Sequence, residues 1–198
     1  MKIIGVCCSP RKEKTTHYAL KSSLDAISEA YPDMDTELID LAGKDINGCI
    51  SCGSCVKKLE CSQDDDFNGL VPILTDEDVK GLIVATPVYL GSMSSQCKAF
   101  MDRCVMFRRN GFLFRDRVGG VIAVGGVRNG GQTATIQHIH AVMLVQDMIV
   151  VGDGKPGAHF GGTMWSGITE GIETDEVGMA TVKSLGKRVA GLALSLGE

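Results

Sequence analysis

The hydrophobic positions of this chain fall into two kinds of segment. Short runs rich in Val, Ile, Leu and Ala are typical of strands in a covered sheet, and they span residues 2–7, 36–41, 81–86, 118–124 and 148–151. The segments between and after them have helix start and stop signals, and they span residues 15–31, 67–75, 94–108, 132–146 and 173–196. We therefore expect strands and helices to alternate along the whole chain.

This alternation favours an α/β fold with a parallel sheet covered on both faces. Five strands with this rhythm fit the flavodoxin-like order 2-1-3-4-5 better than a six-stranded dinucleotide-binding domain. The sequence predicts a five-stranded doubly wound parallel sheet in a single domain over residues 1–198. A compact cysteine-rich insertion at 42–66 follows the second strand, and a long loop at 152–172 precedes the last helix.

Composition and charge exclude several classes of protein. The chain has 198 residues and a net charge of −4, so it lacks the broad basic field that nucleic acid requires. It has neither a recognisable signal peptide nor an apolar run long enough for a membrane span, and we expect a cytoplasmic protein. We expect the acidic run at 64–66 to form a solvated turn. A local basic group, which comprises Arg108, Arg109, Arg115 and Arg117, could face a phosphate or an acidic partner, but a surface role is favoured.

A quartet of cysteines is the most informative motif. Cys49, Cys52, Cys55 and Cys61 lie within thirteen residues, and the chain has no second set of this kind. Such closely spaced thiolates suit a compact soft-metal centre, either an iron–sulfur cluster or structural zinc. Structural zinc usually binds two cysteine pairs separated by a longer insert, so the spacing favours a cluster. Zinc stays the alternative.

The loop after the first predicted strand has the composition of an anion site. Ligands of open parallel sheets bind beyond the carboxyl ends of the strands. Here hydroxyls, a guanidinium and the start of a helix come together in Ser9, Arg11, Thr15 and Thr16. A phosphate monoester fits such a loop, whereas the chain contains no dinucleotide or Walker-type glycine motif. The alternative is that these residues only form a turn and cap the helix.

Two further loops could hold a planar ring. The loop after the third predicted strand offers apolar side chains beside backbone donors, in Pro87, Val88, Tyr89, Leu90 and Gly91. The loop after the fourth allows close approach of the backbone and adds one cation, in Gly125, Gly126 and Arg128. Ordinary strand-to-helix turns are the alternative for both loops.

Together, these loops and the cysteine quartet resemble the iron–sulfur flavoproteins, within the NADPH-dependent FMN reductase family of flavodoxin-like proteins. The resemblance implies FMN as cofactor, with its phosphate at Ser9, Arg11 and Thr15 and its ring at 87–91. It also implies one [4Fe-4S] cluster on the quartet near FMN, and a homodimer or homotetramer. The chain departs from the family pattern at Cys8 and Lys14.

The sequence thus predicts an FMN-dependent oxidoreductase that passes electrons between a redox partner, the cluster and FMN. The partner would be a protein such as a ferredoxin, or NAD(P)H. No side chain is predicted to act as a catalytic acid or base, because the cofactors carry the chemistry. One alternative is an NAD(P)H-dependent FMN or quinone reductase with a structural cysteine region, and another is a zinc-stapled, flavin-free binding module.

Overall fold

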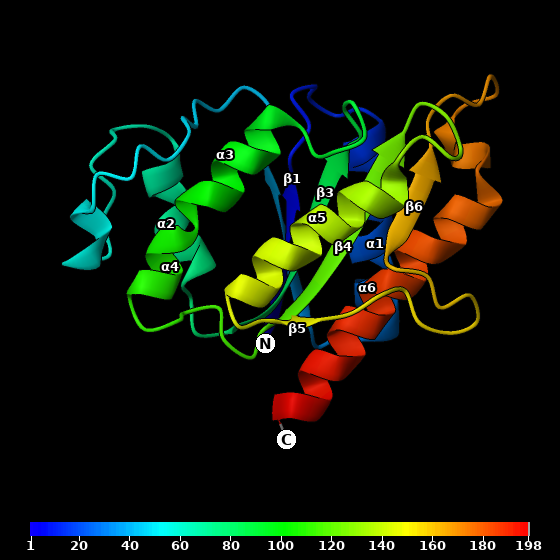
Figure 1. Cartoon of the computed structure of the whole chain (residues 1–198). Helices are drawn as coiled ribbons and strands as arrows, with labels where there is room; N and C mark the ends of the chain where they lie inside the picture. The colour runs from blue at the N-terminus through cyan, green and yellow to red at the C-terminus, as the bar shows by residue number, and fades with distance from the viewer. Residues whose placement is uncertain (198) are drawn as a thin grey trace.

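The computed structural model describes residues 1–197, and its centre is a parallel sheet. The strands are β1 (Lys2–Cys7), β2 (Asp35–Asp40), β3 (Val79–Pro87), β4 (Val118–Gly125), β5 (Ile149–Val150) and β6 (Gly162–Trp165). Five of them follow the order β2-β1-β3-β4-β5, and Figure 1 shows them between two layers of helices. The predicted α/β class and flavodoxin-like order are confirmed.

The fifth position of the sheet differs from the prediction, because two short strands share it. β5 pairs with β4 at Val118 and Gly119, whereas β6 pairs with the other end of β4, from Ile122 to Gly125. The predicted loop at 152–172 therefore contains a strand, which lies beside β4 in Figure 1. β6 could not be recognised from the sequence, because this strand has only four residues, Gly-Thr-Met-Trp, and no continuous apolar run.

Helices cover both faces of the sheet. One face carries α1 (Thr15–Ala30) and α6 (Glu176–Gly197), and the other carries α2 (Phe67–Leu74), α3 (Ser95–Arg103), α4 (Val105–Arg109) and α5 (Gln132–Val145). The single helix expected at 94–108 is in fact two helices. Phe107 N donates to Cys104 O, which is three residues earlier instead of four. This 3₁₀-type hydrogen bond interrupts the α-helical pattern between α3 and α4.

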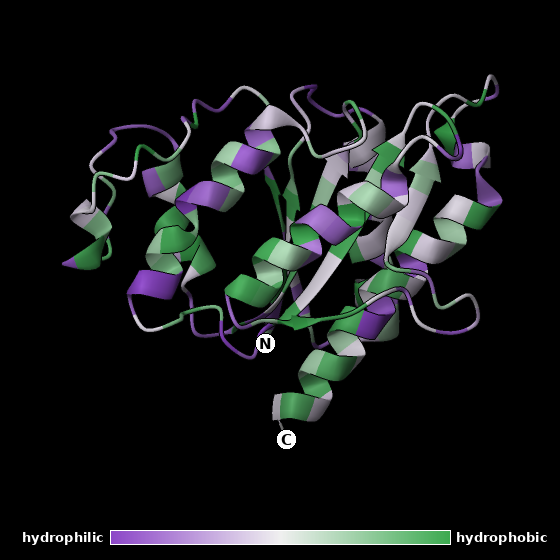
Figure 2. Cartoon of the chain, viewed as in Figure 1, coloured by the Kyte–Doolittle hydropathy of each residue, from purple (hydrophilic) through white to green (hydrophobic). Residues whose placement is uncertain are grey.

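The strands bury side chains on both faces, as their apolar composition predicted. Ile4 and Val6 of β1 belong to the core under α2–α5, whereas Ile3 and Cys7 belong to the core under α1 and α6. Figure 2 shows hydrophobic residues on both strands and helices, and the hydrophilic ones mainly on helices and loops. None of the helices between Met1 and Gly197 combines the length and hydropathy that a membrane span requires.

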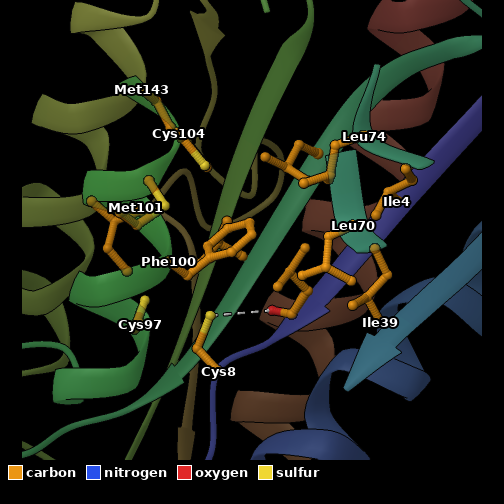
Figure 3. Packing of buried hydrophobic residues seen from close by; sticks show 14 of the residues in the cluster. Ile4, Cys8, Ile39, Leu70, Leu74, Cys97, Phe100, Met101, Cys104 and Met143 are labelled. Atoms are coloured by element: carbon orange, nitrogen blue, oxygen red, sulfur yellow. Dashed lines mark hydrogen bonds between the residues drawn. The ribbon is translucent and has the colours of Figure 1, made fainter. Parts of the chain in front are cut away.

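Two cysteines outside the quartet pack as small apolar residues. Cys97 and Cys104 are buried beside Phe100 and Met101, and Figure 3 shows these side chains of α3 and the turn after it facing the sheet. Burial raises the pKa of Cys104 far above its ordinary value, so it stays a neutral thiol. Packing in the hydrophobic core therefore explains the presence of Cys97 and Cys104.

Candidate functional site

The three loops that the sequence singled out meet at the carboxyl edge of the sheet. Ser94 Oγ, at the start of α3, donates a 2.7 Å hydrogen bond to Cys8 O in the first loop. The second and third loops touch through glycines, since a Cβ atom on Gly131 would lie 3.0 Å from Gly91 Cα. These contacts link the three loops, which Figure 1 shows together above the ends of β1, β3 and β4.

The first loop is organised as an anion cradle. The Ser9 side chain is buried, and its hydroxyl accepts a hydrogen bond from Arg11 N at 3.1 Å. In the described chain no side chain caps the start of α1 at Lys14, and the first turn has no acidic residue. Thr15 is half-buried and Thr16 buried within that turn. The first N–H groups of α1 therefore remain available to a phosphate.

The second loop is a tight turn that presents apolar side chains. Tyr89 and Ser92 exchange backbone hydrogen bonds of 2.8 and 3.1 Å. Leu90 and Gly91 at the tip have left-handed backbone angles, φ +49° and +75°. For leucine this conformation costs about 1–3 kcal/mol, which is typical of functional turns. Of the predicted ring-binding residues, Pro87 is buried, Val88 and Gly91 are half-buried, and Tyr89 and Leu90 are exposed.

The third loop contacts β6. Gly125 ends β4 and is buried, while Gly126 is exposed. Arg128 forms a 3.1 Å ion pair with Asp175, whose side chain is 1% exposed, and its guanidinium lies over the Trp165 ring at 5.1 Å. Asp175 therefore compensates the Arg128 charge, and contact with a flavin ring stays a prediction. The sequence did not reveal Asp175 and Trp165 as neighbours because β6 was not recognised.

The cysteine quartet converges beside α3 and α4. All four cysteines line one small cavity, together with Arg103 and Arg109. Cys55 is buried in the short 3₁₀ helix Ser54–Val56, Cys61 is half-buried, and Cys49 and Cys52 are exposed. The structure thus places the four cysteines around one small cavity, and their role as metal ligands stays a prediction.

One thiol of the quartet is already biased toward the metal-binding form. The Ser62 hydroxyl lies 3.0 Å from Cys52 Sγ, and the Ser54 hydroxyl lies 3.6 Å from it. The hydrogen bond with Ser62, followed by those with the backbone and hydroxyl of Ser54, lowers the pKa of Cys52 to about 7. Thiolates, not thiols, bind metals, so a substantial fraction of Cys52 is ready to coordinate at neutral pH.

The quartet is more open than a mononuclear zinc site. Zinc–sulfur bonds of about 2.3 Å place tetrahedral sulfur ligands about 3.8 Å apart. Among residues 1–197, the ligand atoms of Cys7, His17 and Asp40 lie within 4.8 Å of one another, but those of no three cysteines of the quartet do. Four cysteine thiols are the ligand set of iron–sulfur clusters, and they are not drawn together to the spacing of a zinc site, so these residues fit an iron–sulfur cluster.

A buried ion pair ties both ends of the cysteine segment to α3. Arg103 donates to the two carboxylate oxygens of Asp65 at 2.7 and 3.0 Å, and both side chains are 1% exposed. Arg103 also donates to Asn47 O, and Asp65 accepts from Asn47 N. The expectation that residues 64–66 form a solvated turn is wrong for Asp65, because its carboxylate is buried against Arg103. The local sequence could not show this contact, since Arg103 lies 38 residues further along the chain.

The charge state of Asp65 follows from these contacts. Burial alone would raise the pKa of this carboxyl, but the hydrogen bonds from Arg103 and the Asn47 backbone outweigh burial and lower it. Asp65 is therefore ionised at neutral pH. Arg103 keeps a compensated charge beside the quartet, and its buried Nε has no hydrogen-bond partner among residues 1–197.

A second guanidinium contacts the quartet directly. Arg109 Nη1 donates to Cys55 Sγ at 3.3 Å. Its neighbour Arg108 instead donates to Val145 O. The sequence indicated only a group of basic residues around them, and nothing in that pattern distinguished Arg109. Its role beside the quartet appears only when α4 is placed against the cysteine segment.

Comparison with known proteins identifies the family. The model of the family described as NADPH-dependent FMN reductase matches residues 1–163. The chain belongs to this family. Among curated members, an iron–sulfur flavoprotein of Methanocaldococcus jannaschii is 43% identical over 190 residues and covers 96% of both chains. An iron–sulfur flavoprotein of Methanosarcina thermophila is 38% identical over 189 residues, which are 96% of this chain and 93% of its own.

Solved structures agree on the architecture of this FMN reductase family member. A WrbA-like flavodoxin from Agrobacterium tumefaciens superposes with a TM-score of 0.66 at 18% identity, over 98% of each chain. At this identity the likeness shows the shared fold. Together, the family match and the curated relatives make the chain an FMN-dependent oxidoreductase of the iron–sulfur flavoprotein type.

Proposed function

We propose that this FMN-dependent oxidoreductase passes electrons between a redox partner, a [4Fe-4S] cluster and FMN. Cys49, Cys52, Cys55 and Cys61 would hold the cluster. The position of all four cysteines around one cavity is the observation that supports the proposal. When bound, the cluster would supply one-electron transfer, and FMN would supply one- or two-electron transfer.

The first loop would bind the FMN phosphate. The uncapped N–H groups of α1 point to an anion, and the hydroxyls of Thr15 and Thr16 lie in the same turn. Ser9 shapes the loop through its contact with the Arg11 backbone, and the exposed Arg11 side chain is free to add a charge-assisted hydrogen bond. These residues anchor and orient the cofactor, and none needs to exchange a proton.

The second and third loops would frame the flavin ring. The turn at residues 87–91 presents Val88, Tyr89 and Leu90 as an apolar surface beside the anion cradle. Gly126 leaves the backbone accessible just after β4, and Arg128 adds a cation near this edge, whereas Gly125 is buried. An apolar platform with backbone donors excludes water from one side of a ring and orients it.

Helix α3 connects the two sites. It begins directly after Ser94, which contacts the first loop, and ends at Arg103, beside the cysteines. Nine residues of helix span about 14 Å. Cys49 and Cys52 are exposed, so a redox partner protein such as a ferredoxin could approach the cluster from outside. A homodimer or homotetramer would cover exposed apolar side chains such as Leu144 and Phe160.

Anoxic purification with analysis of iron, sulfide and flavin tests the proposal. We expect about four irons and four sulfides per chain for a [4Fe-4S] cluster, and one FMN. A Cys49→Ser variant should lose the iron, whereas Cys97→Ala, which removes a buried thiol of α3, should retain it. A colourless protein with about one zinc per chain would contradict the proposal and support the zinc-stapled module.

The description of the family favours one second candidate, direct reduction of the flavin by NADPH. Rapid mixing under anoxia distinguishes the two. Flavin bleaching by NADPH alone, at the same rate in a cluster-free variant, would support a reductase with a structural cysteine region. Bleaching that requires a one-electron protein donor and the intact quartet would support electron transfer through the cluster.

A further inference from the structure

We propose that Arg109 raises the reduction potential of the cluster through its contact with the ligand sulfur of Cys55. The inference rests on the proposed function, because it requires a cluster on the quartet. It concerns a residue whose only notable feature in the sequence is its positive charge.

Two consecutive residues at the end of α4 hold the contact in place. Arg109 Nη1 donates to Cys55 Sγ at 3.3 Å, and the Asn110 side chain donates to Cys55 O at 2.8 Å. Asn110 also donates to Met106 O within α4. The 3₁₀ helix that carries Cys55 is therefore fastened to α4, and Arg109 meets the sulfur as a consequence. The Cys55 side chain is largely buried, which limits its access to competing water.

The charge of Arg109 acts on the quartet without a competing anion. Arg103, the other guanidinium beside the cavity, is paired with Asp65 through two hydrogen bonds. Within residues 1–197, Arg109 forms no ion pair with a carboxylate. Of the two cations, Arg109 is therefore the one whose field at the sulfur ligands is not offset by a neighbouring side chain.

A cation at a ligand sulfur stabilises the reduced cluster more than the oxidised one. Reduction adds one electron and makes the centre more negative, so an adjacent positive charge and a donated hydrogen bond favour it. Arg109 is exposed, and water screens its field. We therefore expect its removal to change the one-electron reduction equilibrium by about threefold to tenfold, and tenfold corresponds to about 59 mV.

Three variants separate the contact from surface charge in general. Arg109→Gln removes the charge and Arg109→Lys keeps it without the planar fork. Arg108→Gln is the matched control, because Arg108 is the adjacent residue of α4 but donates to Val145 O and lies over the Phe112 ring. Iron and sulfide contents are measured first, and the midpoint potential is then measured by anoxic redox titration with EPR detection at low salt.

Arg109→Gln should lower the midpoint potential by an amount that corresponds to a threefold to tenfold change in the reduction equilibrium. Arg109→Lys should lower it by less, and Arg108→Gln by the equivalent of less than a twofold change. An unchanged potential in a fully loaded Arg109→Gln protein, or an equal shift in Arg108→Gln, overturns the inference. If Arg109→Gln does not retain the cluster, Arg109→Lys decides, since a potential equal to that of the unmodified protein overturns it. Absence of iron and sulfide from the unmodified protein overturns the proposed function as well, whereas a loaded cluster with an unshifted potential overturns only this inference.

Discussion

Replacing Asp65 with asparagine should release the cysteine segment from α3. The substitution keeps the shape of the side chain but removes the negative partner of Arg103, and both side chains of this pair are 1% exposed. The amide can accept at most one of the two hydrogen bonds that now measure 2.7 and 3.0 Å. An uncompensated buried charge typically costs about 3–5 kcal/mol, so we expect a loss of this size in the free energy of unfolding.

Urea unfolding of the metal-free protein measures this loss, with the chain's single tryptophan, Trp165, as a fluorescent reporter. Hydrogen exchange over residues 47–66 shows whether the cysteine segment opens before the rest. Asp102→Asn is the matched control, because Asp102 pairs with Lys98 on the same helix but their side chains are 43% and 53% exposed. Surface pairs contribute little, so this variant should lose less than about 1 kcal/mol.

The pH dependence gives a second check. The pKa of Asp65 is lowered in the folded protein, so its stabilising effect is present above the ordinary carboxyl range and is lost as pH falls through the folded pKa. The difference between the unmodified protein and Asp65→Asn should therefore begin to shrink below about pH 4 and disappear only below the lowered folded pKa. Equal losses for Asp65→Asn and Asp102→Asn at neutral pH would refute the role of the buried pair.

Three other substitutions test the remaining parts of the site. Cys55→Ser should reduce the iron content of anoxically purified protein to near zero, because it removes the buried ligand of the quartet. Arg11→Ala should weaken FMN binding about tenfold by loss of a charge-assisted hydrogen bond, while riboflavin, which has no phosphate, should bind as before in the same fluorescence titration. Gly131→Ala should lower the free energy of unfolding by about 1–3 kcal/mol, because φ is +101° and the new methyl group would press on Gly91, whereas Gly69→Ala has open space and should not destabilise the protein.

Much of this protein is determined by local sequence. The apolar runs predicted β1, β3 and β4 within a few residues, because a strand buried on both faces needs no partner to be recognised. The spacing of the cysteines predicted their convergence, because residues three apart in a short segment cannot separate far. Loop composition after each strand also indicated the edge of the sheet where ligands bind, because that edge follows from α/β topology.

Tertiary structure decided the rest. β6 has no local apolar signal and becomes a strand only because the end of β4 offers it unpaired backbone. The burial of Asp65 and the contact between Arg109 and Cys55 join residues 38 and 54 positions apart in the chain. No local pattern encodes which member of a basic group meets a sulfur atom, because that choice depends on the direction in which α4 leaves the turn after α3. The cysteine segment can thus be recognised from its sequence, but its electrostatic surroundings arise only when the helices pack against it.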